Sequence, residues 1–338
     1  MRRACTVLVL AGLTADCSSS SSGDSPTVSA EGGAGAASGA GDAATGLLDA
    51  PSKPSAQDAI PGDVTIDSSS SFGTASLDAA NDGAIPGWTL TWSDEFDGPD
   101  GSAVDPTKWQ HEVGGNGWGN GEREYYTAGT QNAVVQGGNL VITAAAAVGS
   151  SNPCWYGACQ YTSARLLTKG LFAQQYGRFE ARIKIPSGQG LWPAFWMLGS
   201  NIDTVKWPSC GEIDVMESIG REPSINHGSL HAPGFPGAGR TGQYALAGGA
   251  KLGDAFHTFA IEWDATTIRF YVDDNLYETQ TPAAIPGGGT WAFDHPFFVV
   301  LNVAVGGSWP GDPNTTTTFP QSMKVDWVRV YQKTSAEP

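Results

Sequence analysis

From residue 88 onward, hydrophobic and polar residues alternate with a period of two. In residues 176–186, the hydrophobic side chains of Phe179, Ala181 and Ile183 would share one face, and charged residues occupy the positions between them. A period of two is that of a β-strand with one face in a core and the other toward solvent. The same pattern predicts half-buried antiparallel strands in residues 258–263, 268–272 and 325–331.

No segment shows a convincing amphipathic helix of ten or more residues. The strands are separated by turns rich in Gly, Pro, Asn and Asp. We therefore expect an all-β fold in which two antiparallel sheets pack face to face, as a β-sandwich or jelly roll. Its core is expected to contain Trp263, Trp291 and Trp327.

The first part of the chain has a different composition. Residues 1–86 contain a single aromatic residue, Phe72, whereas all twelve tryptophans follow. Such a Ser-, Gly-, Ala- and Asp-rich segment buries too little apolar surface to offset the entropy of ordering. We expect residues 18–86 to be a disordered linker, residues 87–333 to form one catalytic domain and residues 334–338 to be a short tail.

The N-terminus has the layout of an export signal. Two arginines precede a short apolar run, which is followed by Cys17 and a run of serines. The apolar run is too short to span a bilayer. A cysteine before a Ser-rich tether resembles a bacterial lipoprotein signal, although Thr14 and Asp16 depart from the usual residues there. We expect residues 1–17 to direct the protein to the cell surface or the medium, either anchored by a lipid on Cys17 or released.

The net charge of the chain limits which classes of molecule it can bind. The formal net charge of −16 argues against nucleic acid and anionic lipid as partners, and a neutral polysaccharide is compatible with it. We expect a monomer without a transmembrane span.

Cys154 and Cys159 flank a short Trp/Tyr/Gly loop, where a disulfide is expected outside the cytoplasm. Cys210 is expected to be a buried thiol, and no Cys/His spacing suggests zinc.

One strand-like segment carries three carboxylates, Glu212, Asp214 and Glu217, within six residues. Acids held close together resist joint ionisation, which is typical of active sites. On a regular strand Glu212 and Asp214 share a face and Glu217 points the other way. A bulge that absorbs Val215 or Met216 would bring all three to one face. The carboxyl groups of the two glutamates would then lie about 5–6 Å apart, the spacing of a retaining glycosidase.

In that arrangement one glutamate attacks the anomeric carbon of a sugar, and the other protonates the leaving oxygen and then deprotonates water. The alternative interpretation of the segment is a solvated acidic strand edge. Trp192 and Trp196, which precede it in the sequence, favour the sugar site because indole rings stack on pyranose rings.

Residues 88–332 resemble glycoside hydrolase family 16, and within it the bacterial endo-β-1,3-glucanases, or laminarinases. The family signature, Glu-aliphatic-Asp-hydrophobic-hydrophobic-Glu, is matched by EIDVME at 212–217, including the extra residue of the bulged branch. Further matching motifs are WSDEF at 92–96, GWGN at 117–120, YTSAR at 161–165, WPAFW at 192–196, WPSCG at 207–211, LNVAVGG at 301–307 and VDWVRVY at 325–331.

The resemblance implies a concanavalin-like jelly roll with a concave substrate groove and catalysis without a cofactor. It implies that Glu212 is the nucleophile, Asp214 its helper and Glu217 the acid/base. It also implies a set of residues that line the groove: Asn116, Arg165, Trp192, Trp196, Trp207 and His231. Structural alternatives stay open for five of these, namely core packing for Trp192, Trp196 and Trp207, a satisfied structural role for His231, and an ion pair on its own sheet for Arg165.

Many members of the family hold a structural calcium ion on the convex side. By resemblance, Glu95, Gly138 and Asp326 would supply its oxygen ligands. The loop after the GWGN motif departs from the family, because this chain has Arg123 and Glu124 where the family usually has Leu and Gln. We expect this change to affect binding of the chain away from the cleavage point. The loop that contains Cys154 and Cys159 also differs from the family pattern.

The leading interpretation is therefore a retaining endo-hydrolase of β-1,3-glucan such as laminarin or curdlan. Alternatives of the same class are a β-1,3-1,4-glucanase, a hydrolase of another β-linked polymer, or a transglycosylase. An alternative of another class is a non-hydrolytic glucan-binding lectin, which commonly lacks one or both glutamates. This chain has both.

Overall fold

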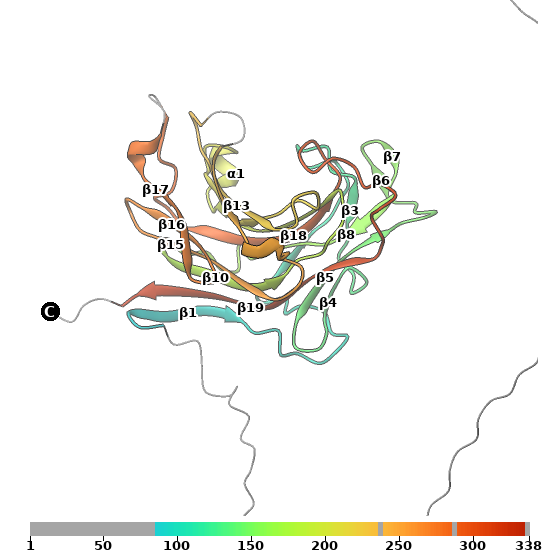
Figure 1. The fold of residues 1–338 in the computed structure, drawn as a ribbon, viewed down its shortest axis with the longest axis horizontal. Coiled ribbons are helices and arrows are strands. Elements are labelled where there is room, and N and C mark those ends of the chain that lie inside the picture. Colours follow the sequence, from blue (N-terminus) through green and yellow to red (C-terminus); the bar gives the residue numbers. More distant parts are fainter. Residues whose placement is uncertain (1–84, 236–238, 286–288, 335–338) are drawn as a thin grey trace, which may run out of the picture. The chain divides into compact units, whose positions relative to one another are not determined.

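The computed structural model describes residues 85–235, 239–285 and 289–334. The predicted export signal with Cys17, the linker up to residue 84 and the tail from residue 335 lie outside the described residues. Two stacked β-sheets make up most of the described chain (Figure 1), which confirms the predicted antiparallel sandwich. Among the described residues, no helix is both long enough and apolar enough to cross a membrane.

One sheet has seven strands, and each strand is antiparallel to its neighbours. In spatial order they are β14 (Arg240–Ala245), β13 (Ile225–His231), β12 (Glu212–Glu217), β11 (Leu191–Gly199), β18 (Phe297–Val305), β9 (Arg165–Leu167) and β2 (Gln110–Glu112). The acidic segment is therefore an inner strand, paired on both sides.

The other sheet has ten strands. Its main path is β17 (Asn275–Gln280), β16 (Ile268–Val272), β15 (His257–Trp263), β10 (Gly177–Lys184), β19 (Gln321–Lys333), β5 (Leu140–Ala146), β8 (Tyr161–Ser163) and β3 (Glu124–Tyr126). In addition, β1 (Trp88–Asp94) pairs with β19, and β4 (Ala133–Val135) pairs with β5. The pairing of β3 with β8 is parallel, which the alternation of residues did not predict.

The remaining elements are short. A two-stranded hairpin consists of β6 (Pro153–Cys154) and β7 (Gly157–Ala158), and the predicted disulfide joins Cys154 to Cys159 at its base. The helical elements in the described part of the chain are α1 (Ile202–Val205), η1 (Ala247–Gly249) and η2 (Pro282–Ala284). None reaches ten residues, as predicted. Cys210 is a free, buried thiol.

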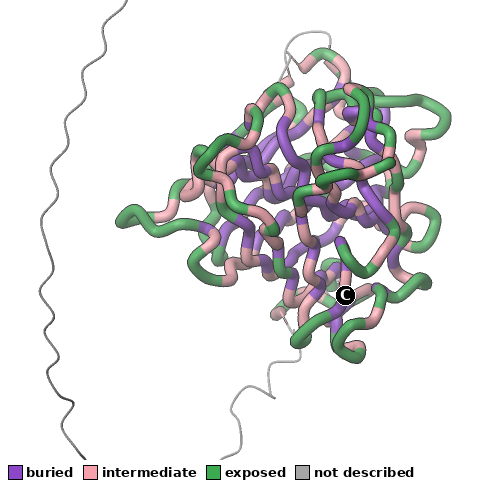
Figure 2. Tube along the Cα trace, turned by 90° about the vertical axis from the view of Figure 1, so that its right-hand side faces the viewer, coloured by how far each residue is buried: buried purple, intermediate pink, exposed green. Residues whose placement is uncertain are grey.

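The core lies between the two sheets. Figure 2 shows the buried chain in the interior of the domain and the exposed chain in the outer loops. In β10 the hydrophobic residues Phe179, Ala181 and Ile183 are fully buried, as the alternation predicts. The opposite face is not simply solvated, because Arg178 and Glu180 are also buried and bind each other through Nε and Oε2 at 2.7 Å. Ion pairing between neighbours makes this burial of charge tolerable.

In strand β19, the alternation of inward and outward side chains differs from the predicted one. Arg182 of β10 lies opposite Trp327, but the next residue, Ile183, lies opposite Val325, so that Asp326 is an extra residue in β19. Such a bulge shifts the residues beyond it to the opposite face. Trp327 is therefore partly exposed on the outer face, and its predicted place in the core is wrong. The predicted core residue Trp263 is 2% exposed, and Trp291 packs against the core from its edge.

Candidate active site

Strand β12 contains the bulge that the acidic segment requires. Across the pairing with β11, Met216 lies opposite Phe195 and Asp214 lies opposite Trp196, so Val215 has no partner of its own. The pairing with β13 shifts between Asp214 and Glu217 as well. Because Val215 is absorbed and buried, Glu217 returns to the face that Glu212 occupies.

Both glutamates line one cavity of about 520 Å³ over the seven-stranded sheet. Five of the six residues predicted to bind substrate also line it, namely Asn116, Arg165, Trp192, Trp196 and Trp207. Trp207 is 54% exposed, which rules out the alternative of core packing. Trp196 lines the cavity while it also packs against a small group of buried residues. The cavity thus combines carboxyl groups with indole rings, the two kinds of side chain that the sugar-site hypothesis requires.

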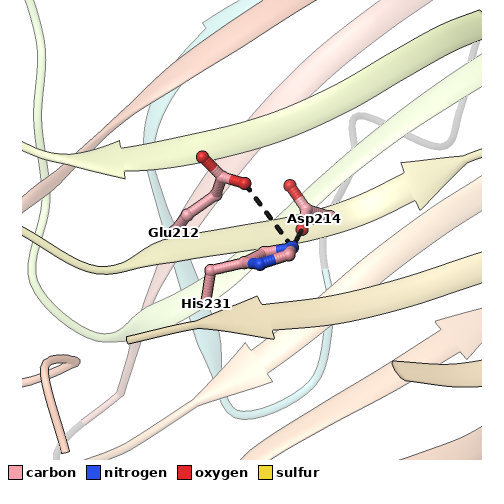
Figure 3. Close-up of side chains that lie close together, drawn as sticks. All are labelled: Glu212, Asp214 and His231. Atoms are coloured by element: carbon pink, nitrogen blue, oxygen red, sulfur yellow. Dashed lines mark ion pairs between the residues drawn. The ribbon is translucent and has the colours of Figure 1, made fainter. Parts of the chain in front are cut away.

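His231 lies on the neighbouring strand, directly opposite Glu212. Its Nε2 atom is 3.2 Å from Oδ2 of Asp214 and 3.6 Å from Oε1 of Glu212. Figure 3 shows the imidazole ring turned toward these two carboxyl groups. His231 is predicted to line the groove, and in the structure its imidazole contacts the two acids. These contacts can hold the carboxyl groups in position.

Arg165 combines the two roles that the sequence left open. Its Nε is 2.7 Å from Oε2 of Glu112, which is its partner on the adjacent strand β2. Its guanidinium also lies over the rings of Trp118 and Trp196, at 4.9 and 4.7 Å from their centroids. These contacts hold a fixed positive charge in the wall of the cavity.

Glu217 is held by Trp192, which lies on the neighbouring strand β11. The indole Nε1 of Trp192 donates a hydrogen bond of 2.9 Å to Oε1 of Glu217. The Trp192 ring meets Trp309 edge-on at 5.3 Å, and Trp309 meets His227 edge-on at 5.0 Å. Packed rings of this kind restrict the rotation of Trp192 and so fix the direction of its N–H group.

The pKa values of all three carboxyl groups are raised. Burial, and then the charge of Asp214, raises the pKa of Glu212 to about 8. Burial raises the pKa of Asp214 well above its usual range. Burial and the charges of Asp214 and Glu212 do the same to the pKa of Glu217. Three acids this close share fewer than three negative charges at neutral pH.

The neighbours distinguish the two glutamates. His231 lowers the pKa of both, but the charge of Arg165 and a hydrogen bond from Trp207 lower that of Glu212 in particular. A hydrogen bond from Trp192 lowers the pKa of Glu217 in the same way, so Arg165 is the contact that favours ionisation of Glu212 over that of Glu217. A nucleophile must be ionised and a general acid protonated, and this difference favours Glu212 as the nucleophile.

Four polar or aromatic residues of the cavity were missed as individual site residues. They are Trp118, Asn120, Glu122 and Asn302. The first two lie inside the quoted GWGN motif, and Glu122 follows it. The signal for Asn302 is its place as the only polar residue in the nine-residue strand β18, all of which is buried. A lone amide in an apolar inner strand needs hydrogen-bond partners, which a site supplies.

These residues form one chain of hydrogen bonds. Nε1 of Trp196 donates to Oδ1 of Asn302 at 2.7 Å, and Nδ2 of Asn302 donates to the hydroxyl of Tyr126 at 3.1 Å. That hydroxyl donates to Oε2 of Glu122 at 2.9 Å, and Asn120 donates to the other oxygen, also at 2.9 Å. The chain fixes one wall of the cavity from β18 to the loop before β3.

The predicted calcium ligands lie apart from this cavity. Both carboxylates are bound by arginines: Glu95 accepts two hydrogen bonds from Arg329, and Asp326 pairs with Arg182. Gly138 lies in a turn with φ of +67°, which favours glycine. Two carboxylates and a backbone carbonyl are the oxygen donors that calcium prefers. An ion at this site would have to displace the arginines, and the calcium site stays a prediction.

Comparisons with known proteins agree with this arrangement. The sequence model of the family described as Glycosyl hydrolases family 16 matches residues 93–329. A protein named Beta-glucanase from Rhodothermus marinus is 41% identical over 272 residues, which are 77% of this chain and 91% of that protein.

Two solved structures are similar in fold and in sequence. The catalytic domain of an endo-1,3-beta-glucanase (laminarinase) from Thermotoga petrophila RKU-1 superposes with a TM-score of 0.67 at 46% identity, covering 73% of this chain and 98% of that one. An endo-beta-1,3-glucanase from Pyrococcus furiosus gives a TM-score of 0.68 at 46% identity, covering 74% and 96%.

Proposed function

We propose that this chain, which belongs to glycosyl hydrolases family 16 and is a glycoside hydrolase, cleaves internal bonds of β-1,3-glucan. The cleavage proceeds with retention of configuration. The observation that carries this proposal is the bulge at Val215, which brings Glu212 and Glu217 to one face of β12 and into one cavity. Two carboxyl groups on one side of a strand can act on a single bound sugar.

The choice of polymer is supported by what the similar proteins are named to cleave. The Thermotoga and Pyrococcus enzymes are described as endo-1,3-β-glucanases, and the Rhodothermus protein as a β-glucanase. The cavity itself suits a neutral sugar chain, since Trp192, Trp196 and Trp207 provide rings for stacking and Asn116 and Asn302 provide amides for hydroxyl groups.

In the first step, the Glu212 carboxylate attacks the anomeric carbon of the sugar. A C–O bond forms to Glu212 as the glycosidic C–O bond breaks, and Glu217 transfers its proton to the departing oxygen. The raised pKa of Glu217 supplies that proton at neutral pH, and the hydrogen bond from Trp192 keeps its Oε1 in place. The product is a glycosyl ester on Glu212 and a shortened chain with a free hydroxyl group.

In the second step, the Glu217 carboxylate takes a proton from water while the water oxygen attacks the same carbon. The ester bond to Glu212 breaks, Glu212 returns as a carboxylate, and Glu217 is again protonated. Two inversions give net retention. Asp214 and His231, in contact at 3.2 Å, stabilise the changing charge beside Glu212. A sugar hydroxyl in place of water would give transglycosylation.

Size analysis of products tests this function directly. Laminarin and curdlan should yield a ladder of short oligosaccharides from the start of the reaction, whereas barley glucan and agarose should be cleaved more slowly or not at all. Preference for barley glucan would indicate the mixed-linkage alternative, and preference for agarose would overturn the choice of substrate. Binding of laminarin without any release of reducing ends would indicate the lectin alternative.

We also propose that the protein is exported, anchored by a lipid on Cys17, and acts as a monomer outside the cell. The sequence features that support export lie outside the described residues. Metabolic labelling with palmitate should mark the wild-type chain and not the Cys17→Ser variant. Labelling of neither would favour release into the medium, and sedimentation at a dimer's mass would contradict the monomer.

A further inference from the structure

One tryptophan beyond the cavity lining is more than half exposed. Trp155 lies between β6 and β7, and 56% of it is accessible to solvent. Among the twelve tryptophans, all of which the structure describes, only Trp207 is similarly exposed, at 54%, and Trp207 lines the catalytic cavity. A large apolar ring held in water is characteristic of a binding surface.

The Trp155 ring is fixed. Its indole Nε1 donates to the backbone oxygen of Glu122 at 2.8 Å, and its backbone N–H donates to the oxygen of Gly115 at 2.8 Å. Tyr156 packs edge-on against it at 5.4 Å and donates its own hydroxyl to the backbone oxygen of Arg123. The disulfide between Cys154 of β6 and Cys159, which follows β7, restricts it further. Few rotamers remain to be lost on binding, which favours affinity.

The hairpin lies against the loop that forms one wall of the cavity. Four side chains of this loop, those of Asn116, Trp118, Asn120 and Glu122, line the cavity. Between them the backbone is in direct contact with the hairpin, because a Cβ atom on Gly117 would lie 2.9 Å from Cδ1 of Trp155. Figure 1 shows β6 and β7 rising at the edge of the fold, next to β3 and β8. The exposed ring therefore contacts the same loop whose side chains line the cavity.

We infer that Trp155 is an outlying sugar-binding platform, which stacks on a glucan ring several units from the cleaved bond. The inference rests on the proposed function, because its ligand is the same polysaccharide chain. The flat indole face suits the C–H face of a pyranose ring, and the sugar hydroxyls stay in water. Trp155 thus favours long chains over short ones and takes no part in bond cleavage.

Comparison of a long and a short substrate tests this role. For Trp155→Ala, we expect kcat/KM on laminarin to fall about three- to tenfold, mainly through KM, because one aromatic stacking contact has that worth. On the shortest oligosaccharide that the wild type cleaves, kcat/KM should not change. Trp155→Phe keeps a ring and should retain most of the activity. Val148→Ala, which alters a fully exposed residue shortly before the hairpin, is the matched control. It should leave kcat/KM unchanged on both substrates.

A binding measurement removes turnover from the test. The binding of laminarin is compared between Glu217→Gln and the double variant Glu217→Gln/Trp155→Ala. In a native gel that contains laminarin, the double variant should be retarded less than the single variant, and in a gel without polymer the two should migrate equally. An equal loss on long and short substrates, or no loss on either, would overturn the inference. If the wild type cleaves another β-glycan instead, the proposed linkage is wrong. The ratio of kcat/KM on long chains of that polymer to kcat/KM on short ones would still test the role of Trp155.

Discussion

Trp192 fixes Glu217 through a hydrogen bond of 2.9 Å from its indole Nε1 to Oε1 of the carboxyl group. The bond connects a ring that lines the cavity to the group that we assign as the acid/base. Because an N–H donor stabilises the ionised form, it lowers the pKa of Glu217 against burial and the neighbouring charges, which raise it. The same contact therefore sets both the direction and the acidity of this carboxyl group.

Removal of that donor should change both rate and pH dependence. In Trp192→Phe a ring remains, but the pKa of Glu217 should rise further, so the alkaline limb of the kcat/KM profile should move to higher pH. The rate at the optimum should fall roughly tenfold or more, because the bond involves a charged group. An unchanged alkaline limb would show that the titrating acid is not Glu217.

Neutralising Asp214 should have the opposite effect on the profile. The charge of Asp214 raises the pKa values of Glu212 and Glu217. Asp214→Asn removes this repulsion, so both the acid and the alkaline limbs of the profile should shift to lower pH, with kcat reduced roughly tenfold or more. Glu112→Gln, which alters a carboxylate paired with Arg165 on another strand, serves as a comparison. A shift of both limbs to higher pH in Asp214→Asn would contradict the arrangement.

The buried carboxyl group of Glu124 should lower the free energy of unfolding at neutral and alkaline pH relative to its value at acid pH. Burial and the charge of Glu122 raise its pKa well above 4.5. The folded protein therefore holds a proton that the unfolded chain gives up, and stability is lost as pH rises through this interval. Glu124→Gln keeps an oxygen for the backbone N–H of Val305, bonded at 2.6 Å, and has no such loss. Its Tm should equal that of the wild type near pH 4 and exceed it at pH 8, where its free energy of unfolding should be higher by about 1 kcal/mol or more.

Thermal unfolding at both pH values provides the measurement. Glu278→Gln is a suitable control, because Glu278 is less buried and its pKa is raised to a smaller extent. A Tm for Glu124→Gln below that of the wild type at pH 8 would show that the carboxyl group is needed for packing.

The calcium prediction concerns stability and not the reaction. If Glu95, Gly138 and Asp326 hold an ion, millimolar Ca²⁺ should raise Tm by a few degrees, and a chelator should reverse the effect. Glu95→Gln should abolish this response, whereas Asp97→Asn, two residues along the chain, should keep it. A Tm that is insensitive to Ca²⁺ and chelator would contradict the prediction, and the pairs with Arg329 and Arg182 would then be the state of these carboxylates.

Much of the fold and the catalytic strand could be predicted because the information is local. Residues 268–272 match β16 residue for residue, since each position is fixed by whether it faces the core. The bulge at Val215 followed from the positions of three acids on one strand. The Cys154–Cys159 disulfide followed from spacing and the expected compartment.

The rest depended on contacts between distant segments. The bulge at Asp326 has no local signal, so the face of Trp327 was wrongly predicted. His231 contacts the acids because β13 pairs with β12 in one register, which its own sequence does not reveal. The wall formed by Asn302, Tyr126 and Glu122 joins segments about 180 residues apart in the chain.

Covalent trapping tests the central claim, that Glu212 attacks a sugar held between it and Glu217. An activated 2-deoxy-2-fluoro glycoside of the cleaved glucan slows the second step more than formation of the ester. Intact-mass analysis should show one added sugar per chain, and peptide mapping should place it on Glu212. A label on another residue, or turnover that releases the α-anomer first with no label at all, would contradict the account.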